Sequence, residues 1–205
     1  MPIEGLQPSA EARGIFVTPA NDNSTTCVPP LQMRRFDSEI PVKRVLHFNS
    51  PAQKYHCDAV VVACFDHRFD LVLRKFLKRI NVVNPDPIVV AGGAKSLASP
   101  EHEADREFLI AQVEKSIRLH GTDRVILMLH SDCGAYGGLH KAFSGDETAE
   151  VDHHRGELRR AYAVLKGAFP QLSIECYFVD FKGVWQLDSG ILPDAGGFAE
   201  GLNLL

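Results

Sequence analysis

From about residue 57 onward, short continuous apolar runs alternate with segments whose apolar residues recur at helical spacing. Runs of this length without polar interruption are typical of strands that are buried on both faces of a sheet. Such strands are predicted over residues 58–64, 87–91, 124–129 and 172–179. Because helical segments separate them, the order predicts an α/β fold with a mostly parallel central sheet of about four strands and helices on its faces.

The segments between these strands carry the signals of helices. After the first strand, one apolar stripe is formed by residues 69, 72, 73, 76, 77 and 80. The basic residues at 74, 75, 78 and 79 lie off this stripe, so we interpret them as a solvated helix face rather than a binding patch. A second helix is predicted to start at Ser99-Pro100-Glu101 and to end at Gly121. A short helix after Cys133 and a longer one over about 150–167 follow.

Residues 1–43 have a different composition from the rest of the chain. They hold six of the twelve prolines and a polar run at 21–26. This pattern predicts a partly irregular N-terminal arm or tail, which is either disordered or wrapped around a partner subunit. Residues 44–205 are then expected to form one α/β domain.

Composition and charge narrow the possible partners. The 205 residues are 45% hydrophobic and 23% charged, which is ordinary for a globular protein, and the formal net charge is −4. This charge argues against a nucleic-acid surface that depends on bulk positive charge. The sequence shows neither an apolar run long enough to span a membrane nor the apolar region of a secretory signal. With five cysteines, an odd number, we expect reduced thiols, a cytoplasmic location and no membrane partner.

Two short motifs follow the ends of two predicted strands. Cys64, Asp66 and Arg68 come after the first strand, and His130 and Cys133 come after the third. The carboxyl ends of parallel strands meet at one edge of a sheet, where ligands bind. Two thiolates and an imidazole suit zinc, and three such ligands leave a fourth position for water or a carboxylate such as Asp66. Either motif alone is also compatible with a core cysteine, but the pair favours a catalytic zinc site.

The pair of motifs, CxDxR followed by HxxCG, resembles the β-class carbonic anhydrases. The likeness covers roughly residues 57–190, and Gly183–Gly190 resembles the last strand and turn of that family. The resemblance implies a β-carbonic-anhydrase-like fold and a homodimer or a multiple of dimers. It also implies one Zn²⁺ per subunit, bound by Cys64, His130 and Cys133.

The same resemblance assigns Asp66 and Arg68 as the catalytic pair, with Asp66 as a possible fourth metal ligand in a closed state. The expected activity is that of a zinc lyase: reversible hydration of CO2 to bicarbonate and a proton by zinc-bound hydroxide. Zinc can lower the pKa of a bound water from about 15.7 to about 7, which supplies hydroxide at neutral pH. The alternatives are a zinc hydrolase of another small heterocumulene, COS or CS2, and a catalytically silent zinc-binding scaffold.

Several positions depart from the family pattern. His67 stands where the family has serine, and it is either a proton shuttle or an ordinary polar residue at a helix start. Ala91–Lys95 replaces an Arg-Asn-Ala-Gly-like run, and only 72 residues follow Cys133 (205 − 133). The glutamine that lines the family's CO2 pocket is expected from the N-terminal region, where Gln32 and Gln53 are candidates.

The remaining candidates are assigned minor roles. His153 and His154 are predicted to lie on the surface, because adjacent residues of a helix face different directions. Possible neighbours of the site or of its cleft are Tyr136, Gly137, Gly138 and His140. Structural or incidental thiols are Cys27, Cys57 and Cys176.

Overall fold

The structure is a computed structural model, and it describes residues 44–187 and 202–204. The chain divides into a unit of residues 1–50 and a unit of residues 51–205, and every helix and strand described below lies in the second. In the first unit, residues 44–50 form an exposed loop. The predicted arm over 1–43, with Cys27 and Gln32, lies outside the described residues, as do residues 188–190 of the C-terminal motif.

Strands and helices alternate along most of the second unit. The strands are β1 (Ala59–Cys64), β2 (Pro85–Val90), β3 (Arg124–His130), β4 (Ser173–Val179), β5 (Val184–Leu187) and β6 (Leu202–Leu204). The α-helices are α1 (Asp70–Arg79), α2 (Lys95–Ala98), α3 (Glu103–His120), α4 (Leu139–Phe143) and α5 (Glu147–Ala168). Two 3-10 turns, η1 (His67–Phe69) and η2 (Gly134–Tyr136), follow β1 and β3.

The strands form one sheet in the order β2-β1-β3-β4-β5-β6. The first four strands pair in parallel, whereas β5 and β6 add antiparallel pairings at one edge. The predicted mostly parallel α/β sheet is therefore confirmed, with two strands more than the apolar runs indicated. β5 has only four residues and β6 only three, so neither carries an apolar run long enough to be recognised by pattern.

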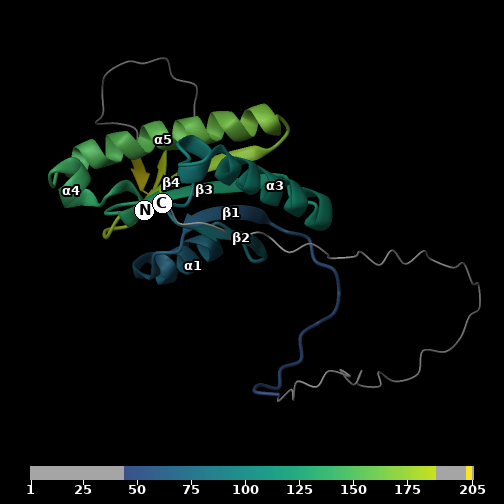
Figure 1. Ribbon diagram of the computed structural model, residues 1–205. Coiled ribbons are helices and arrows are strands. Elements are labelled where there is room, and N and C mark those ends of the chain that lie inside the picture. The colour runs from purple at the N-terminus through teal and green to yellow at the C-terminus, as the bar shows by residue number, and fades with distance from the viewer. Residues whose placement is uncertain (1–43, 188–201, 205) are drawn as a thin grey trace, which may run out of the picture. The chain divides into compact units, whose positions relative to one another are not determined.

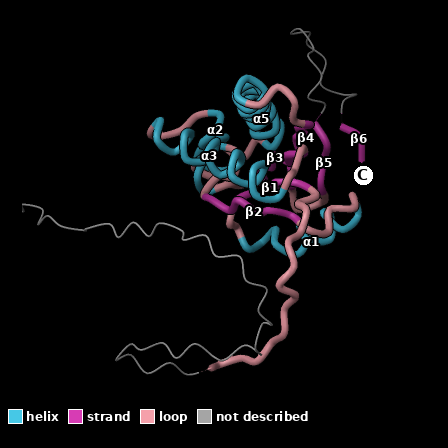
Figure 2. The backbone as a smooth tube through the Cα atoms, turned by 90° about the vertical axis from the view of Figure 1, so that its right-hand side faces the viewer, coloured by secondary structure: helices cyan, strands magenta, loops and turns pink. Residues whose placement is uncertain are grey.

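Helices cover both faces of the sheet. Figures 1 and 2 show α2, α3 and α5 on one face and α1 on the other. In β1, Val60 and Val62 pack into the core under α2, α3 and α5, whereas Ala59, Val61 and Ala63 pack into the core on the α1 side. Burial on both faces explains why the strands have continuous apolar runs instead of alternating patterns.

The helices differ from the predicted ones mainly in the residues at which they begin. α3 begins at Glu103, because Ser99 ends α2 and donates its hydroxyl to Glu157 instead of capping α3. The predicted end is confirmed, since Gly121 closes α3 in the left-handed conformation, with φ 70°. α5 begins at Glu147, where Asp146 accepts two backbone hydrogen bonds as its cap. Among the described residues, none of the helices is long and apolar enough to cross a membrane.

Candidate metal centre

The ends of two neighbouring strands bring the predicted metal ligands together. β1 and β3 pair in parallel, so Cys64 at the end of β1 and His130 at the end of β3 emerge at the same edge of the sheet. Cys133 follows in the turn after β3. One ligand atom from each of the three residues lies within 4.8 Å of the other two. Cys133 and His130 are buried and Cys64 is partly buried, so the three donors converge at a largely enclosed point.

The His130 imidazole is oriented with one nitrogen facing this point. Its Nδ1 lies 2.8 Å from the carbonyl oxygen of Ser131, which can only accept, so Nδ1 carries the proton and donates it. Nε2 is then the free acceptor, and this buried atom has no hydrogen-bond partner. A metal-ligating histidine shows the same arrangement, in which one ring nitrogen donates to a carbonyl and the other faces the metal. The donor set therefore fits zinc.

The two thiols share one hydrogen bond, and their pKa values move apart. The bond from Cys133 lowers the pKa of Cys64 to about 4; burial opposes this, while His130 and the backbone N–H groups of Asp66 and Gly92 lower it further. The same bond to Cys64, together with burial, raises the pKa of Cys133. Two sulfur atoms beside an imidazole nitrogen suit a soft or borderline dication, whose binding would release thiol protons.

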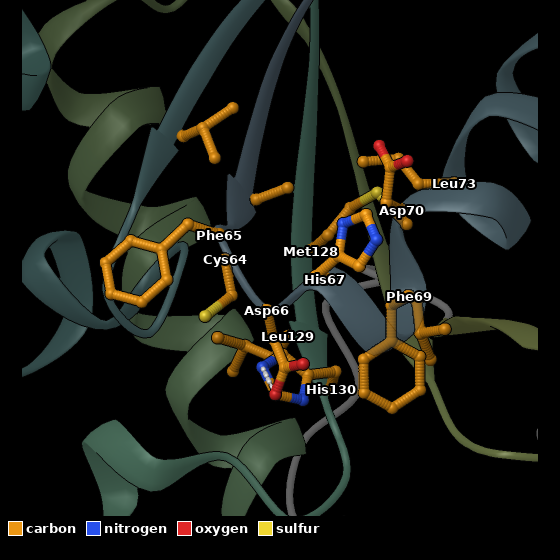
Figure 3. A pocket seen from close by; sticks show the side chains of 13 residues that line it. Cys64, Phe65, Asp66, His67, Phe69, Asp70, Leu73, Met128, Leu129 and His130 are labelled. Atoms are coloured by element: carbon orange, nitrogen blue, oxygen red, sulfur yellow. Dashed lines mark ion pairs between the residues drawn. The ribbon is translucent and has the colours of Figure 1, made fainter.

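Asp66 and Arg68 form a bidentate ion pair beside these ligands. Arg68 Nη2 lies 2.6 Å from Asp66 Oδ2, and Nε lies 3.0 Å from both carboxylate oxygens. These bonds hold the pKa of Asp66 down at about 2, against the opposing effect of burial. Asp66 Oδ2 is also 4.0 Å from His130 Nε2, and Figure 3 shows the two side chains facing each other. Asp66 is thus an ionised carboxylate at the edge of the metal centre.

Arg68 has a second carboxylate partner that sequence reasoning missed. Its Nη1 lies 2.9 Å from Asp132 Oδ2, and its Nη2 donates to the Asp132 carbonyl oxygen at 3.0 Å. Asp132 lies inside the HxxC motif, between two ligands, yet the motif alone gave it no role. The structure therefore links the turn after β1 to the turn after β3 through one guanidinium group.

Two buried residues of α5 also lie behind the site, and the sequence contained a signal for them. Leu158 and Leu165 belong to the apolar stripe of α5. His154 lies one helical turn before Leu158 and Glu150 lies two turns before it, so both share the same face of the helix. Both are buried, with exposed fractions of 0% and 1%. The surface prediction is confirmed for His153, which is exposed, and is wrong for His154, which faces the core on this stripe.

A small cavity opens beside the metal ligands. It has a volume of about 140 Å³ and is bordered by Cys64, Asp66 and His130. Its other walls are mostly apolar and include Ala63, Phe65, Phe69, Leu73, Met128 and Val179. His67 also lines it and is exposed (Figure 3). The volume is well below that of sites for drug-sized ligands, about 300–1,000 Å³, so the cavity suits a small, weakly polar molecule.

The Ala91–Lys95 segment, which departs from the family pattern, packs directly against the site. Gly92 and Gly93 both have positive φ, at 71° and 56°. A Cβ atom on Gly93 would lie 2.5 Å from the Met128 carbonyl oxygen and 3.0 Å from the Cys64 backbone nitrogen. Glycine is required here by close backbone contact as well as by conformation.

The other sequence candidates lie away from the metal ligands or serve the core. Among the described thiols, Cys57 and Cys176 are buried and free, which agrees with a structural role. Gln53 lies in an exposed loop before β1 and does not line the cavity, and His140 is exposed on α4. Tyr136 donates to Glu157 at 2.9 Å, so it packs between the site and α5.

Comparison with known proteins places the chain in a family. A family model described as "Putative carbonic anhydrase" matches residues 54–188. An uncharacterized protein of Rickettsia bellii is 24% identical over 128 residues, which cover 61% of this chain and 77% of the relative. An uncharacterized protein of Rickettsia conorii is 24% identical over 131 residues, which cover 61% and 68%.

Solved carbonic anhydrases give more distant likenesses. The enzyme of Streptococcus mutans is 17% identical, with a TM-score of 0.45 over 65% of this chain and 82% of that one. A β-carbonic anhydrase of Trichomonas vaginalis is 12% identical, with a TM-score of 0.46 over 68% and 87%. The family model covers well over half of the chain, including both strand-end motifs. The chain therefore belongs to the family described as putative carbonic anhydrases, and its Cys64, His130 and Cys133 form the cluster that resembles a β-carbonic anhydrase zinc site.

Proposed function

We propose that this protein is a zinc-dependent carbonic anhydrase that catalyses the reversible hydration of CO2 to bicarbonate and a proton. The observation that carries the proposal is the convergence of two thiols and the free His130 Nε2 beside an Asp–Arg pair and a small apolar cavity. Cys64, His130 and Cys133 would hold the ion. Bound zinc would supply hydroxide at neutral pH by lowering the pKa of water.

Asp66 and Arg68 have distinct roles in this proposal. Arg68 keeps Asp66 ionised and fixes both carboxylate oxygens, so Asp66 can accept a hydrogen bond from the attacking water and orient it. Because Asp66 is bonded to Arg68, the fourth position beside the three ligands is left for that water. This arrangement supports the open form of the site and argues against a silent scaffold, which would have little need for the pair.

The cavity walls suit the second reactant. CO2 is small, linear and without net charge, and the apolar side chains around the cavity offer it a site from which bulk water is displaced. COS and CS2 share these properties, so they remain the alternative substrates. His67 lies between the cavity and solvent, where it either passes the product proton outward or serves only as a polar residue of η1.

Stopped-flow CO2 hydration at mildly alkaline pH, with quantified zinc, tests the proposal. We expect hydration that rises in proportion to zinc occupancy. Asp66→Asn should keep its zinc and lose about 10²–10⁴-fold in turnover, the range for a group that assists proton transfer. Full zinc occupancy without hydration would contradict the proposal, and parallel assays with COS and CS2 would then separate a different substrate from a silent scaffold. Loss of zinc from Asp66→Asn would contradict the open form.

Three further expectations stay predictions. A dimer or a multiple of dimers, and a cytoplasmic location, come from the family resemblance and the sequence composition. The N-terminal arm over 1–43 is the third. Light scattering of the full chain, compared with a chain that starts at residue 44, measures both the oligomeric state and any contribution of the arm to it.

A further inference from the structure

A buried carboxylate on α5 lies directly behind the peptide that joins two of the metal ligands. Glu150 is 1% exposed, and neither of its carboxylate oxygens faces solvent. Its Oε1 accepts a hydrogen bond of 2.6 Å from the backbone N–H of Asp132, and its Oε2 accepts one of 3.0 Å from the Ser131 hydroxyl. Both donors belong to the segment between His130 and Cys133. A buried carboxylate is stable only when it is hydrogen-bonded in this way.

Asp132, whose N–H donates the shorter of these two bonds, has a left-handed backbone conformation. Asp132 has φ 54°, a left-handed conformation that is uncommon for a residue with a side chain. Such residues persist only when the surrounding structure fixes them from several sides. Glu150 holds the N–H of Asp132, Arg68 holds its carbonyl and carboxylate oxygens, and the N–H of Leu139 donates to the carboxylate at 2.9 Å.

This turn decides where the two ligands point. The Ser131 carbonyl oxygen accepts the bond that orients His130, and Cys133 follows Asp132 directly in the chain. If the Ser131–Asp132 peptide rotated, the His130 ring and the Cys133 side chain would both move away from Cys64. We propose that Glu150 is a positioning residue for the metal centre: it holds the Ser131–Asp132 peptide so that His130 and Cys133 face the same point. The inference rests on the zinc site of the proposed function and names a residue that controls it.

The neighbour of Glu150 on α5 does not compete for its carboxylate. His154, one turn further along α5, is fully buried, and its Nε2 lies 3.9 Å from Glu150 Oε1. Burial lowers the pKa of His154 to about 3, so its ring is neutral and packs against Tyr136 and Phe178, with centroid distances of 4.6 and 5.4 Å. At 3.9 Å the His154 Nε2 makes no hydrogen bond with Glu150, and the hydrogen bonds of the carboxylate go to the Ser131–Asp132 turn.

Two substitutions separate geometry from charge. A glutamine in place of Glu150 can still accept from the fixed Asp132 N–H through its oxygen, and its NH2 group can donate to Ser131, whose hydroxyl rotates. Glu150→Gln therefore keeps both contacts without the negative charge, whereas Glu150→Ala removes both. Glu157 provides the matched control, since it lies on the same helix, is also 1% exposed and bonds Ser99, Tyr136 and Arg160 instead of the Ser131–Asp132 peptide.

The experiment measures metal binding in the full-length protein. Zinc affinity comes from competition with a chelator, and ligand geometry comes from the absorption spectrum of the Co²⁺-loaded protein, at a temperature where all variants are folded by circular dichroism. We expect Glu150→Ala to bind zinc about 10–100-fold more weakly, as for other groups that orient metal ligands, and to change the Co²⁺ spectrum. The zinc affinity of Glu150→Gln should stay within about threefold of the wild-type affinity.

Three results would overturn the inference. The first is Glu150→Ala with wild-type zinc affinity and spectrum. The second is Glu150→Gln as impaired as Glu150→Ala, which would mean that charge, not position, matters. The third is an equal loss of zinc affinity in Glu157→Ala, which would assign the effect to general destabilisation of α5. Because metal binding is measured, a wild-type protein that holds zinc without hydrating CO2 would contradict the proposed function and leave this inference intact.

Discussion

The two ends of the sheet each hold a group of polar side chains that includes a histidine, yet the groups differ in one respect. At the amino end, Asp86 of β2 accepts from Tyr55 at 2.6 Å through Oδ1, while its Oδ2 accepts from Ser116 and lies 2.7 Å from His120 Nδ1. Both carboxylate oxygens have partners. At the carboxyl end, His130 Nε2 has none.

The cysteines of the two ends also differ, in the direction in which their surroundings move the thiol pKa. Burial raises the pKa of Cys57, next to the Asp86 group, whereas hydrogen bonding lowers that of Cys64. A group whose hydrogen bonds are complete within the protein joins elements of the fold. A group with an unpaired buried donor or acceptor, next to a cavity, is instead built for a ligand. Residue types alone do not distinguish the two ends, but the state of their hydrogen bonds does.

The largest effect is expected from a pair of cysteine substitutions. Cys133→Ala should lower zinc affinity by at least about a hundredfold, because it removes one of three protein ligands. Cys57→Ala removes an equally buried thiol at the other end and should leave affinity unchanged. Chelator competition and metal analysis measure both. Equal zinc loss in the two variants would contradict the conclusion that the carboxyl end of the sheet, and not the amino end, binds the metal.

A pair of glycine substitutions is expected to have a smaller effect on stability. Gly121→Ala, at the amino end, meets only ordinary contacts with the His56 ring and should cost about 1–2 kcal/mol for its left-handed conformation. Gly93→Ala carries the same conformational cost and also forces apart the backbones at Met128 and Cys64. Urea unfolding of the zinc-free proteins should therefore show the larger loss for Gly93→Ala. A smaller loss than that of Gly121→Ala would show that the site tolerates backbone shifts.

The smallest effect is a pH dependence at the amino end. Burial alone would raise the pKa of Asp86, but the bonds from Ser116, Tyr55 and His120 lower it overall. This lowered pKa stabilises the fold above the unfolded-state pKa of about 3.9, and the stabilisation is lost as the pH falls through the folded-state pKa.

Asp86→Asn should therefore cost about 0.5–1.5 kcal/mol at neutral pH, where the wild-type carboxylate is charged and bonded, because the asparagine amide oxygen can still accept a hydrogen bond. The difference from wild type should shrink as the medium becomes acidic. Urea unfolding over a pH series measures it, and zinc content serves as the control. A constant difference at all pH values, or a loss of zinc at neutral pH, would contradict the separation of the two ends.

The parallel strands and the cluster of candidate metal ligands could be predicted because local pattern determines them. A strand buried on both faces shows as an apolar run, and topology then brings Cys64, His130 and Cys133 to one edge. The burial of Glu150 and His154 was missed although both continue the stripe of Leu158 and Leu165, because a polar residue on such a stripe is buried only when another element packs opposite it. Ser99 illustrates the same limit. The residues around it are typical of a helix cap, but its hydroxyl donates a hydrogen bond to Glu157, which is distant in sequence. β5 and β6 are too short for periodicity to detect.

The distance in sequence between the metal ligands has a consequence for how the chain folds. Cys64 and His130 meet only after β1 and β3 have paired, which closes a long loop and occurs late compared with local helix formation. Of these three side chains, His130 and Cys133 alone are neighbours in an unfolded chain, so the three cannot hold one ion together before the strands pair. Zinc should therefore bind the unfolded ensemble poorly and favour the folded state by mass action, so that the rate of tight zinc uptake reports when these two strands come together during folding.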